Sequence, residues 1–231
     1  MPEKNNIINC ESCPVRWIGF QHLGTGELQM INDNRYEAVF KPGEIMIKQG
    51  SPASNALFLA SGIAKTYIEG LKGRNFIMSI AQPGRLIMGP GAYVNLRYTY
   101  SVAAITFVQA CFVHFDILRH LVKVNGDFAE DLLKDISTKS LRSHTRMVNL
   151  AQKKMPGRLA EVLLYFADEV FHADEYEMIL SRKELGEMTN MAKESVVRIL
   201  RDMEESGVIS STASAIRIID RNMLTMISEK G

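Results

Sequence analysis

The stretch LSRKELGEMTNMAKESVVRILRDMEESGVIS, residues 180–210, decides how the C-terminal part of the chain folds. Ser181 is followed three residues later by Glu184, which is the pattern of a capping box at the start of a helix. The first helix is predicted to end near Met188, and a second, amphipathic helix is predicted at 192–205. Two short helices this close together predict a helix-turn-helix unit.

The turn and the neighbouring segments complete this pattern. Asn190 tolerates the left-handed backbone that a tight inter-helix turn needs, and Gly207 ends the second helix. The sequence GVISSTASAIRIID, residues 207–220, predicts two short strands around a polar tip, and a terminal helix is expected at 221–229. Another helix is predicted at 158–171, directly after the break at MPG. Together these elements predict a winged helix-turn-helix.

Residues 36–115 have the pattern of short strands separated by turns. Turn signals stand at Pro42-Gly43, Gly50-Ser51-Pro52, Ser61-Gly62, Lys72-Gly73 and Pro83-Gly84. The run YSVAAITFVQACFVHF, residues 100–115, is rich in the β-prone residues Val, Ile, Phe and Thr. Short strands with regular turns predict an antiparallel sandwich or barrel.

Between residues 116 and 154 the apolar residues recur at every third or fourth position, and Gly126 is the only glycine. This period predicts a short helix followed by a long one of about seven turns. The stripe of the long helix comprises Leu132, Ile136, Ser140, Ser143, Met147 and Leu150. A second copy of the chain would cover this stripe in a parallel two-helix seam, or the stripe would pack only on its own barrel.

The order of β-roll, long helix and winged helix-turn-helix resembles the Crp/Fnr family of bacterial transcription regulators. The strand region carries this resemblance weakly, through FKPGEIMIKQG, ALFLASGIAKTY and QPGRLIMG; the long helix carries it moderately, with GRLAEVLL at 157–164, and the stretch at 180–210 strongly. The resemblance implies an α+β fold in three parts. These are a cyclic-nucleotide-binding-like β-roll (jelly roll) sensor domain at 1–115, a short helix and a long dimerisation helix at 116–154, and a winged helix-turn-helix DNA-binding domain at 155–231.

The resemblance also implies that the second helix enters the major groove, with its N-terminal residues on base edges. The family motif R-E-T-x-x-R aligns without gaps with KESVVR, which assigns base reading to Lys193, Glu194 and Arg198, with Val197 in the variable slot. Arg pairs with guanine, Glu accepts from cytosine, and Lys reaches guanine or phosphate. Alternatively, Glu194 and Arg198, four residues apart, form only a solvated ion pair. Candidate phosphate contacts are Ser181, Arg182, Ser195 and Arg201.

In the sensor domain, the resemblance draws attention to two places. Relatives that bind cyclic AMP carry Gly-Glu-Leu and then Arg-Ser or Arg-Thr, with the acid on the ribose and the arginine on the phosphate. Here these places read Met88-Gly89-Pro90 and Tyr100-Ser101-Val102, so both charged groups are missing and cyclic AMP is not the expected effector. The candidate effector pocket comprises Met88, Gly89, Ser101, Val102, Ser143 and His144.

The three cysteines suggest other effectors. The oxygen-sensing Fnr branch holds a [4Fe–4S] iron–sulfur cluster with a C-x2-C-x5-C run and one distant cysteine. Cys10 and Cys13 match the first pair and Cys111 matches the distant cysteine, but Gly19 stands at the middle position, and four thiolates are the usual requirement. A cluster or other metal site, a thiol redox switch, and no role at all are the alternatives. Haem is a further candidate cofactor, for which His114, His120 and His144 are available.

Bulk composition limits where the protein acts. The chain has 231 residues, 46% of them hydrophobic, and no run of 18 apolar residues, so no membrane span is expected. The N-terminus MPEKNNIINCESCPV has no apolar core of a secretion signal. An odd number of cysteines, three, does not form a disulfide framework, and a cytoplasmic location is expected.

Charge and motifs limit what the protein binds. Residues 1–155 carry 18 Lys and Arg against 12 Asp and Glu, whereas residues 156–231 carry 9 against 14, so DNA contact would depend on locally placed basic groups. We find no Walker loop, no G-x-S-x-G and no H-E-x-x-H, and we do not expect an enzyme. The expected partners are an inverted repeat in double-stranded DNA, a second copy of the chain and, by family resemblance, RNA polymerase. A sensor module whose winged helix binds protein is the alternative.

Overall fold

The computed structural model describes residues 9–212 and 214–231, so most of the segment considered for a secretion signal lies outside the described residues. The chain divides into two compact units. One holds the residues up to Ile68 together with Ile80–Lys139, and the other holds Glu69–Ser79 together with Ser140–Gly231. The long helix α4 (Gly126–Gln152) contributes to both units, and each unit is described by itself below.

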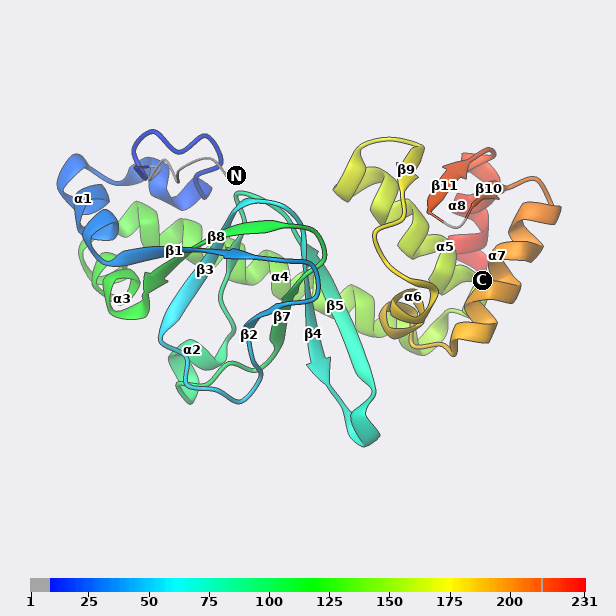
Figure 1. Ribbon diagram of the computed structural model, residues 1–231, viewed down its shortest axis with the longest axis horizontal. Helices are drawn as coiled ribbons and strands as arrows, with labels where there is room; N and C mark the ends of the chain where they lie inside the picture. The colour runs from blue at the N-terminus through cyan, green and yellow to red at the C-terminus, as the bar shows by residue number, and fades with distance from the viewer. Residues whose placement is uncertain (1–8, 213) are drawn as a thin grey trace. The chain divides into compact units, whose positions relative to one another are not determined.

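The strands of the sensor region form two four-stranded antiparallel sheets, coloured from blue to green in Figure 1. The first sheet has the order β1-β8-β3-β6, with β1 (Arg35–Phe40), β8 (Val108–His114), β3 (Asn55–Ser61) and β6 (Leu86–Ile87). The second has the order β2-β7-β4-β5, with β2 (Ile45–Ile47), β7 (Ser101–Ala104), β4 (Ala64–Glu69) and β5 (Asn75–Ala81). The predicted antiparallel sandwich is confirmed.

The turns between these strands lie where the glycine signals predicted them. Gly62, between β3 and β4, has φ +81°, and a Cβ there would lie 2.1 Å from the carbonyl oxygen of Phe107. Only glycine combines this backbone with so close an approach. The predicted single run at 100–115 is instead two strands, β7 and β8, separated by residues 105–107.

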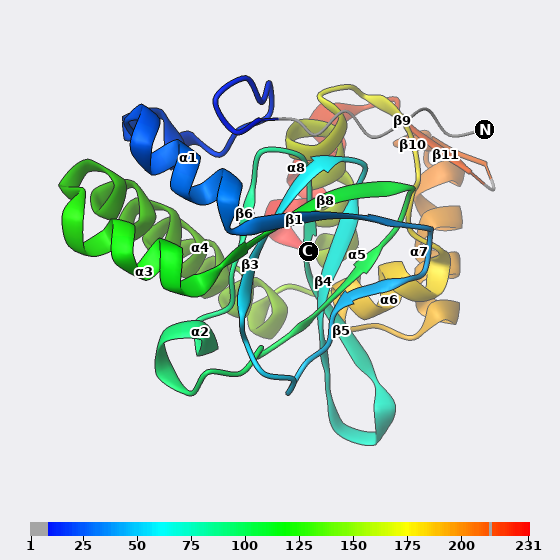
Figure 2. The same cartoon turned by 60° about the vertical axis from the view of Figure 1, so that its left-hand side comes forward.

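Helices cover one end of the first unit, as Figure 2 shows for α1 and α3. They are η1 (Ile18–His22), α1 (Thr25–Asp33), α2 (Gly91–Val94) and α3 (Phe115–Val124), followed by α4. An aromatic cluster forms the core beneath them, in which the rings of Trp17 and Phe128 meet edge to face with centroids 5.7 Å apart. Such pairs stabilise a core beyond their buried area.

The predicted stripe of α4 requires a correction in this unit. Leu132 is only 5% exposed and belongs to the apolar core of the β-roll, together with Phe128. The two side chains are four residues apart and therefore lie on the same helix face. Because its own domain covers Leu132, this residue is not available to a second copy of the chain.

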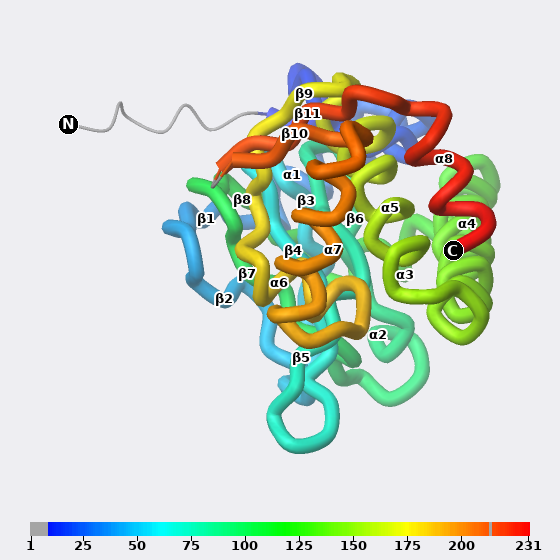
Figure 3. The backbone as a smooth tube through the Cα atoms, turned by 90° about the vertical axis from the view of Figure 1, so that its right-hand side faces the viewer, coloured from blue at the N-terminus to red at the C-terminus, as the bar shows by residue number. Residues whose placement is uncertain are grey.

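The second unit contains the predicted winged helix-turn-helix, whose backbone Figure 3 traces from yellow-green to red. Its helices are α5 (Met155–Tyr165), the π-helix η3 (Phe166–Phe171), α6 (Arg182–Thr189), α7 (Lys193–Glu205) and α8 (Arg221–Lys230). Its sheet has the order β10-β11-β9, with β10 (Ile209–Ser211), β11 (Ala215–Ile218) and β9 (Glu175–Glu177). The wing thus has three strands, because β9 pairs with the predicted hairpin.

Arg146 of α4 joins three segments of the second unit. Its guanidinium donates to the carbonyl oxygens of Ile77, at 2.7 Å, and Met188, at 2.6 Å, and also to that of Met78. It lies over the ring of Phe76, with 4.9 Å to the centroid. The short 3-10 turn η2 (Leu71–Gly73) also belongs to this unit. Burial lowers the pKa of Arg146, which is the expected effect when a cation loses water.

Among the helices that the structure describes, none is long and apolar enough to cross a membrane.

Candidate nucleic-acid interface and sensor site

Helix α6 begins with the predicted capping box. The backbone N–H of Glu184 donates to Ser181 Oγ over 3.2 Å, and the backbone N–H of Ser181 donates to Glu184 Oε2 over 2.8 Å. The Ser181 hydroxyl also donates to the same carboxylate over 2.7 Å. Each residue therefore satisfies a backbone group that the helix start would leave unpaired.

The turn between α6 and α7 is tight and needs two special residues. Asn190 has φ 54° and ψ 53°, the left-handed conformation that the sequence predicted. A Cβ on Gly186 would lie 2.6 Å from the carbonyl oxygen of Met191, so a side chain there would collide with backbone. Arg158 of α5 donates to the Thr189 carbonyl over 3.1 Å and so links α5 to the residue that precedes the turn.

Helix α7 has one buried and one exposed face. Val196, Ile199, Leu200 and Met203 are at most 4% exposed and pack into the second unit. Their spacing of three, one and three residues is that of a single helix face. The amphipathic character predicted for this helix is confirmed.

The four expected base-reading residues all lie on the exposed side of α7. Lys193, Glu194 and Arg198 are exposed, and Val197 is 48% exposed although it is apolar. Arg198 lies 3.4 Å from Asp202, so its i,i+4 ion pair is with Asp202 rather than with Glu194. An exposed pair of this kind contributes little to stability, about 0.3–0.5 kcal/mol, and can open when a ligand offers a better partner.

The residues expected at phosphates have different surroundings. Ser181 and Arg201 are exposed and Ser195 is half-buried. Arg182 instead points into its own domain, where its Nη2 donates to Ser211 Oγ over 2.9 Å and to the Thr212 carbonyl over 2.8 Å. Burial lowers its pKa. The structure argues against the expected phosphate contact of Arg182, because its guanidinium holds the wing strands against α6.

The start of α7 suits an anion as well as base edges. The residue before the helix is Ala192, whose side chain cannot accept a hydrogen bond, so the first-turn N–H groups keep their donor capacity. Lys193 stands at the first helical position and adds a positive charge. This arrangement of an exposed helix start, a cation and hydrogen-bonding side chains can bind a nucleic-acid groove.

The outer face of α4 carries an apolar row that the described residues leave exposed. Its exposed apolar residues are Leu133, Ile136, Leu141, Met147 and Val148, which are 46–66% exposed. Ser140, Ser143 and His144 are exposed beside them, whereas Leu150 is half-buried. Three of the six positions predicted for a seam thus lie on one exposed face of α4, namely Ile136, Ser140 and Met147. Leu133 lies on the same face, although the sequence pattern did not select it.

In the β-roll, the residues at the two positions where cyclic-AMP-binding relatives carry their charged groups are packed against the roll itself. Ser101 and Val102 have no exposed surface, and the Ser101 hydroxyl accepts from the backbone N–H of Gln49 over 2.9 Å. Gly89 is buried, with Thr99 Oγ1 3.2 Å from its Cβ position, and Met88 is half-buried. Ser143 and His144 belong to the other unit.

The nearest arginine does not compensate for the missing charges. Arg97 donates to the Gly50 carbonyl over 2.7 Å, and its backbone forms an isolated antiparallel bridge with Pro52. Burying a cyclic phosphate without a charged partner would cost several kcal/mol. The residues present therefore do not fit a cyclic nucleotide bound through the charged pair of cyclic-AMP-binding relatives.

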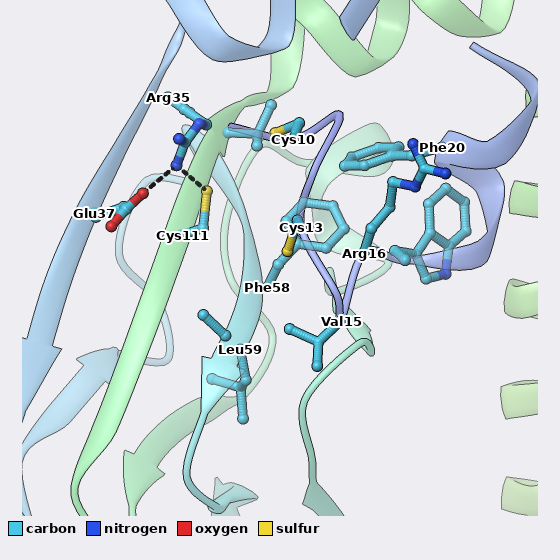
Figure 4. A pocket seen from close by; sticks show the side chains of 13 residues that line it. Cys10, Cys13, Val15, Arg16, Phe20, Arg35, Glu37, Phe58, Leu59 and Cys111 are labelled. Carbon is cyan, nitrogen blue, oxygen red and sulfur yellow. Dashed lines mark hydrogen bonds and ion pairs between the residues drawn. The ribbon is translucent and has the colours of Figure 1, made fainter. Parts of the chain in front are cut away.

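The three cysteines line one pocket of the first unit, shown in Figure 4. Cys10 and Cys13 come from the segment before η1, and Cys111 comes from β8. The cavity holds about 50 Å³, room for a few water molecules rather than for a cubane of four iron and four sulfur atoms. The fold thus brings Cys111 to the same pocket as Cys10 and Cys13, which lie about a hundred residues earlier in the sequence.

These cysteines do not fit a [4Fe–4S] cluster. The fourth ligand position is Gly19, and a Cβ there would lie 2.1 Å from the indole ring of Trp17. Among the residues that the structure describes, no group of three or more His, Cys, Asp and Glu side chains could hold a metal ion. The indole fills the place that a fourth thiolate would need.

A charged pair borders the same pocket, which sequence reasoning missed. Arg35 Nη1 donates to Glu37 Oε1 over 2.6 Å and to Cys111 Sγ over 3.4 Å, as the dashed lines in Figure 4 show. Although burial opposes it, hydrogen bonds with Glu37 and Cys111 raise the pKa of Arg35. Glu37 lies directly opposite Cys111 in the β1–β8 register. Charged residues at alternate positions of a strand were the available signal.

Burial controls the acidity of two of the thiols. It raises the pKa of Cys10 to about 11, against the opposing charge of Arg35. It also raises the pKa of Cys111, although the hydrogen bond and charge of Arg35 oppose it. Cys10 and Cys111 are therefore protonated at neutral pH. Cys13 is half-buried and belongs to a segment whose neighbouring residues are exposed.

The three candidate haem ligands do not share an enclosed site. His114, His120 and His144 are all exposed, and His114 accepts from the backbone N–H of Asp116 at the start of α3. A haem pocket needs an apolar enclosure around its axial ligand. The surroundings of these residues do not fit haem.

Comparison with known families agrees with this architecture. Residues 37–125 match the model of the cyclic nucleotide-binding domain, and residues 157–227 match the model of the Crp-like helix-turn-helix domain. The two matches together cover most of the chain and leave the α4 segment between them.

Known proteins resemble the chain over most of its length. It is 26% identical over 175 residues to the cAMP-activated global transcriptional regulator CRP of Salmonella typhimurium, covering 74% of this chain and 83% of that protein. It is 25% identical over 184 residues to the transcriptional activator protein anr of Pseudomonas aeruginosa, covering 78% and 75%. The structure of FixK2 from Bradyrhizobium japonicum superposes with a TM-score of 0.76 at 20% identity, covering 84% of this chain and 96% of that one. At that identity the structural likeness shows the fold alone.

Proposed function

Because the chain belongs to the Crp/Fnr family of DNA-binding transcription regulators, we propose that it acts as a homodimer that reads an inverted repeat with α7. The observation that carries the proposal is the exposed edge of α7, where Lys193, Glu194, Val197 and Arg198 stand together while the opposite face is packed. Side chains at the front of such a helix can reach base edges in the major groove. Two copies would contact half-sites about one helical turn apart, roughly 34 Å.

Within this edge, each side chain has a distinct task in the proposal. Arg198 would donate to guanine O6 and N7, and Glu194 would accept from the N4 amino group of cytosine. Lys193 would reach guanine or phosphate, and Val197 would contact the methyl group of thymine or leave its slot unread. Ser181, Ser195 and Arg201 would bind phosphates and so fix the register of the helix.

The sensor domain would control this contact without a cyclic nucleotide. Its buried Ser101 hydroxyl and the Arg97 side chain are both engaged in contacts of the roll. A different signal would change the first unit and alter DNA affinity through α4, which runs through both units. Binding to RNA polymerase would follow from the family, as would the change in transcription.

DNA titrations test the base-reading assignment. Fluorescence anisotropy with a selected inverted repeat, at several salt concentrations, should show affinity that falls steeply as salt rises. Arg198→Ala should weaken binding by about 1–3 kcal/mol and relax selectivity at one base position. Arg201→Ala is the matched control, since loss of a phosphate contact weakens all sequences equally. Equal losses for both variants on every sequence, or affinity independent of salt, would contradict the assignment.

A second experiment tests the homodimer. The exposed apolar face of α4 is the support for it, since Leu133, Ile136 and Met147 recur at spacings of a two-helix seam. Ile136→Glu should convert dimer to monomer in sedimentation velocity and reduce affinity for the full repeat to that for a half-site. The matched control is Thr138→Glu, because Thr138 is exposed and two residues further along the helix, which places it on the opposite side of the same turn. A parent chain that sediments as a monomer at micromolar concentration refutes the proposal.

A further inference from the structure

The strongest unassigned feature is the pocket that gathers all three cysteines of the chain. Two of them come from a segment that precedes the β-roll, and the third comes from a central strand of its first sheet. The structure records all three as free thiols. A guanidinium borders the same cavity and donates to one of the sulfurs.

We infer that this pocket is a redox-responsive thiol site in which a hydroperoxide joins Cys13 to Cys111 as a disulfide. The inference rests on the proposed regulatory function for its effect on DNA, but the thiol chemistry can be tested without DNA. Its ligand class is a small peroxide, because a cavity of about 50 Å³ has room for hydrogen peroxide beside the thiols.

The environments of the three thiols assign their roles. Cys13 is half-buried in a segment whose neighbouring residues are exposed, so an oxidant from solvent reaches it first. Cys111 receives the hydrogen bond of Arg35 at 3.4 Å, and this cation stabilises the thiolate that must form when Cys111 attacks. Cys10 is 7% exposed and its backbone N–H donates to Asn32 over 3.0 Å, so it stays in place as part of the core.

The proposed reaction has two steps. The Cys13 thiolate attacks one oxygen of the peroxide, the O–O bond breaks, and water leaves after taking up a proton, which produces a sulfenic acid. The Cys111 thiol then loses its proton, its thiolate attacks this sulfur, the S–O bond breaks, and the hydroxide leaves as a second water after taking up a proton. Two thiols are oxidised and one hydrogen peroxide is reduced, with one disulfide and two water molecules as products.

The disulfide would have a structural consequence in the first unit. Cys111 lies in β8, which ends at His114, and α3 begins at the next residue. A covalent link from the N-terminal segment to β8 therefore acts on the strand that leads directly into the helical region. Such a link restricts the segment before η1, which the hydrogen bonds of Asn9 and Asn32 otherwise hold.

The experiment uses the full chain, reduced and then treated with hydrogen peroxide. Free thiols are alkylated after denaturation and the peptides are analysed by mass spectrometry, with a non-reducing gel to detect links between chains. The expected result is the loss of two of three thiols, a Cys13–Cys111 peptide pair, and full reversal by dithiothreitol. Cys10→Ala is the matched control, and it should cross-link as the parent does, whereas Cys13→Ala and Cys111→Ala should not.

Several results would overturn the inference. A link between Cys10 and Cys13, links only between chains, or oxidation of Cys13 to sulfinic acid without a disulfide each contradicts it. The same samples are then titrated with DNA, and oxidised and reduced protein should differ at least about fivefold in affinity, a coupling of about 1 kcal/mol. A clean disulfide with unchanged affinity overturns its regulatory role. Reduced protein that binds no DNA counts against the proposed function and leaves the cross-linking result intact.

Discussion

The outward face of α7 and the β6–β7 region of the roll differ in how they use their polar groups. On α7, Lys193, Glu194 and Arg198 are exposed, and the ion pair of Arg198 with Asp202 is a weak surface contact. Between β6 and β7, the Ser101 hydroxyl and the Arg97 guanidinium are engaged by backbone groups of the same unit. The first region keeps its polar groups available to a partner, whereas the second uses them for its own structure.

This difference shows how one chain can present the exposed polar edge that nucleic-acid recognition needs while its roll lacks a charged pair for a cyclic phosphate. The helix-turn-helix needs its packed face for folding and its exposed face for recognition, and the two faces do not compete. A nucleotide site in the roll needs charged groups that point into a pocket, and these are costly to keep without their ligand. In this roll such charged groups are absent, and the Ser101 hydroxyl and the Arg97 guanidinium form hydrogen bonds with the backbone instead.

The largest expected effect is at Gly186, a buried glycine of α6 behind the start of α7, and Gly89, a buried glycine between β6 and β7, is its comparison. Gly186→Ala should reduce the free energy of unfolding by about 2–3 kcal/mol, because its Cβ would lie 2.6 Å from the Met191 carbonyl oxygen. Helix propensity alone predicts the opposite sign, a gain of about 1 kcal/mol. Gly89→Ala should cost less than about 1 kcal/mol, because its Cβ meets the Thr99 side chain at 3.2 Å and that side chain can shift.

Urea unfolding of both variants checks this prediction, together with DNA titration of the folded protein. Gly26→Ala is the control, because no atom lies within 4 Å of its Cβ position in α1, and it should be neutral or slightly stabilising. Equal destabilisation by Gly186→Ala and Gly89→Ala would remove the contrast between the closely packed α6–α7 turn and the side-chain surroundings of Gly89.

Local chemistry explains why the sequence predicted the DNA-binding unit so closely. The Ser181–Glu184 capping box, the left-handed Asn190 and the packed face of α7 each depend on residues a few positions apart. Such short-range patterns fix helix boundaries and turn geometry directly. The stretch at 180–210 therefore contained most of the information about its own structure.

The errors arose where distant contacts decide. Leu132 belongs to an apolar stripe, but only the fold shows that its own roll covers that position. The sequence places Arg182 at the start of a helix, where a phosphate contact is expected. Only the fold shows that its guanidinium donates instead to oxygens of Ser211 and Thr212 in the wing. Glu37 and Cys111 are 74 residues apart in the sequence, and strand pairing brings them together, which no local pattern could show.

The smaller expected effect concerns Cys10 and the alkaline stability of the sensor region. Burial raises the pKa of this thiol from 9.0 to about 11 in the folded chain. The folded state therefore holds the proton more tightly than the unfolded state, so this contribution is fully present below pH 9 and is lost as pH rises through 11. At pH 10 the loss amounts to about 1.4 kcal/mol, since one pKa unit corresponds to about 1.36 kcal/mol.

Urea unfolding of reduced parent and Cys10→Ala at pH 7 and pH 10 isolates this contribution. Tyrosines with raised pKa also weaken the folded state at high pH, but they are present in both proteins and cancel in the comparison. The parent should lose about 1.4 kcal/mol more than Cys10→Ala between the two pH values. Parallel losses would mean that the Cys10 thiol ionises as freely as in the unfolded chain. In that case the cysteine pocket would be open to solvent. The Cys10 thiol would then be hydrated like the exposed side chains of α7, and not enclosed by protein like the Ser101 hydroxyl of the β6–β7 region.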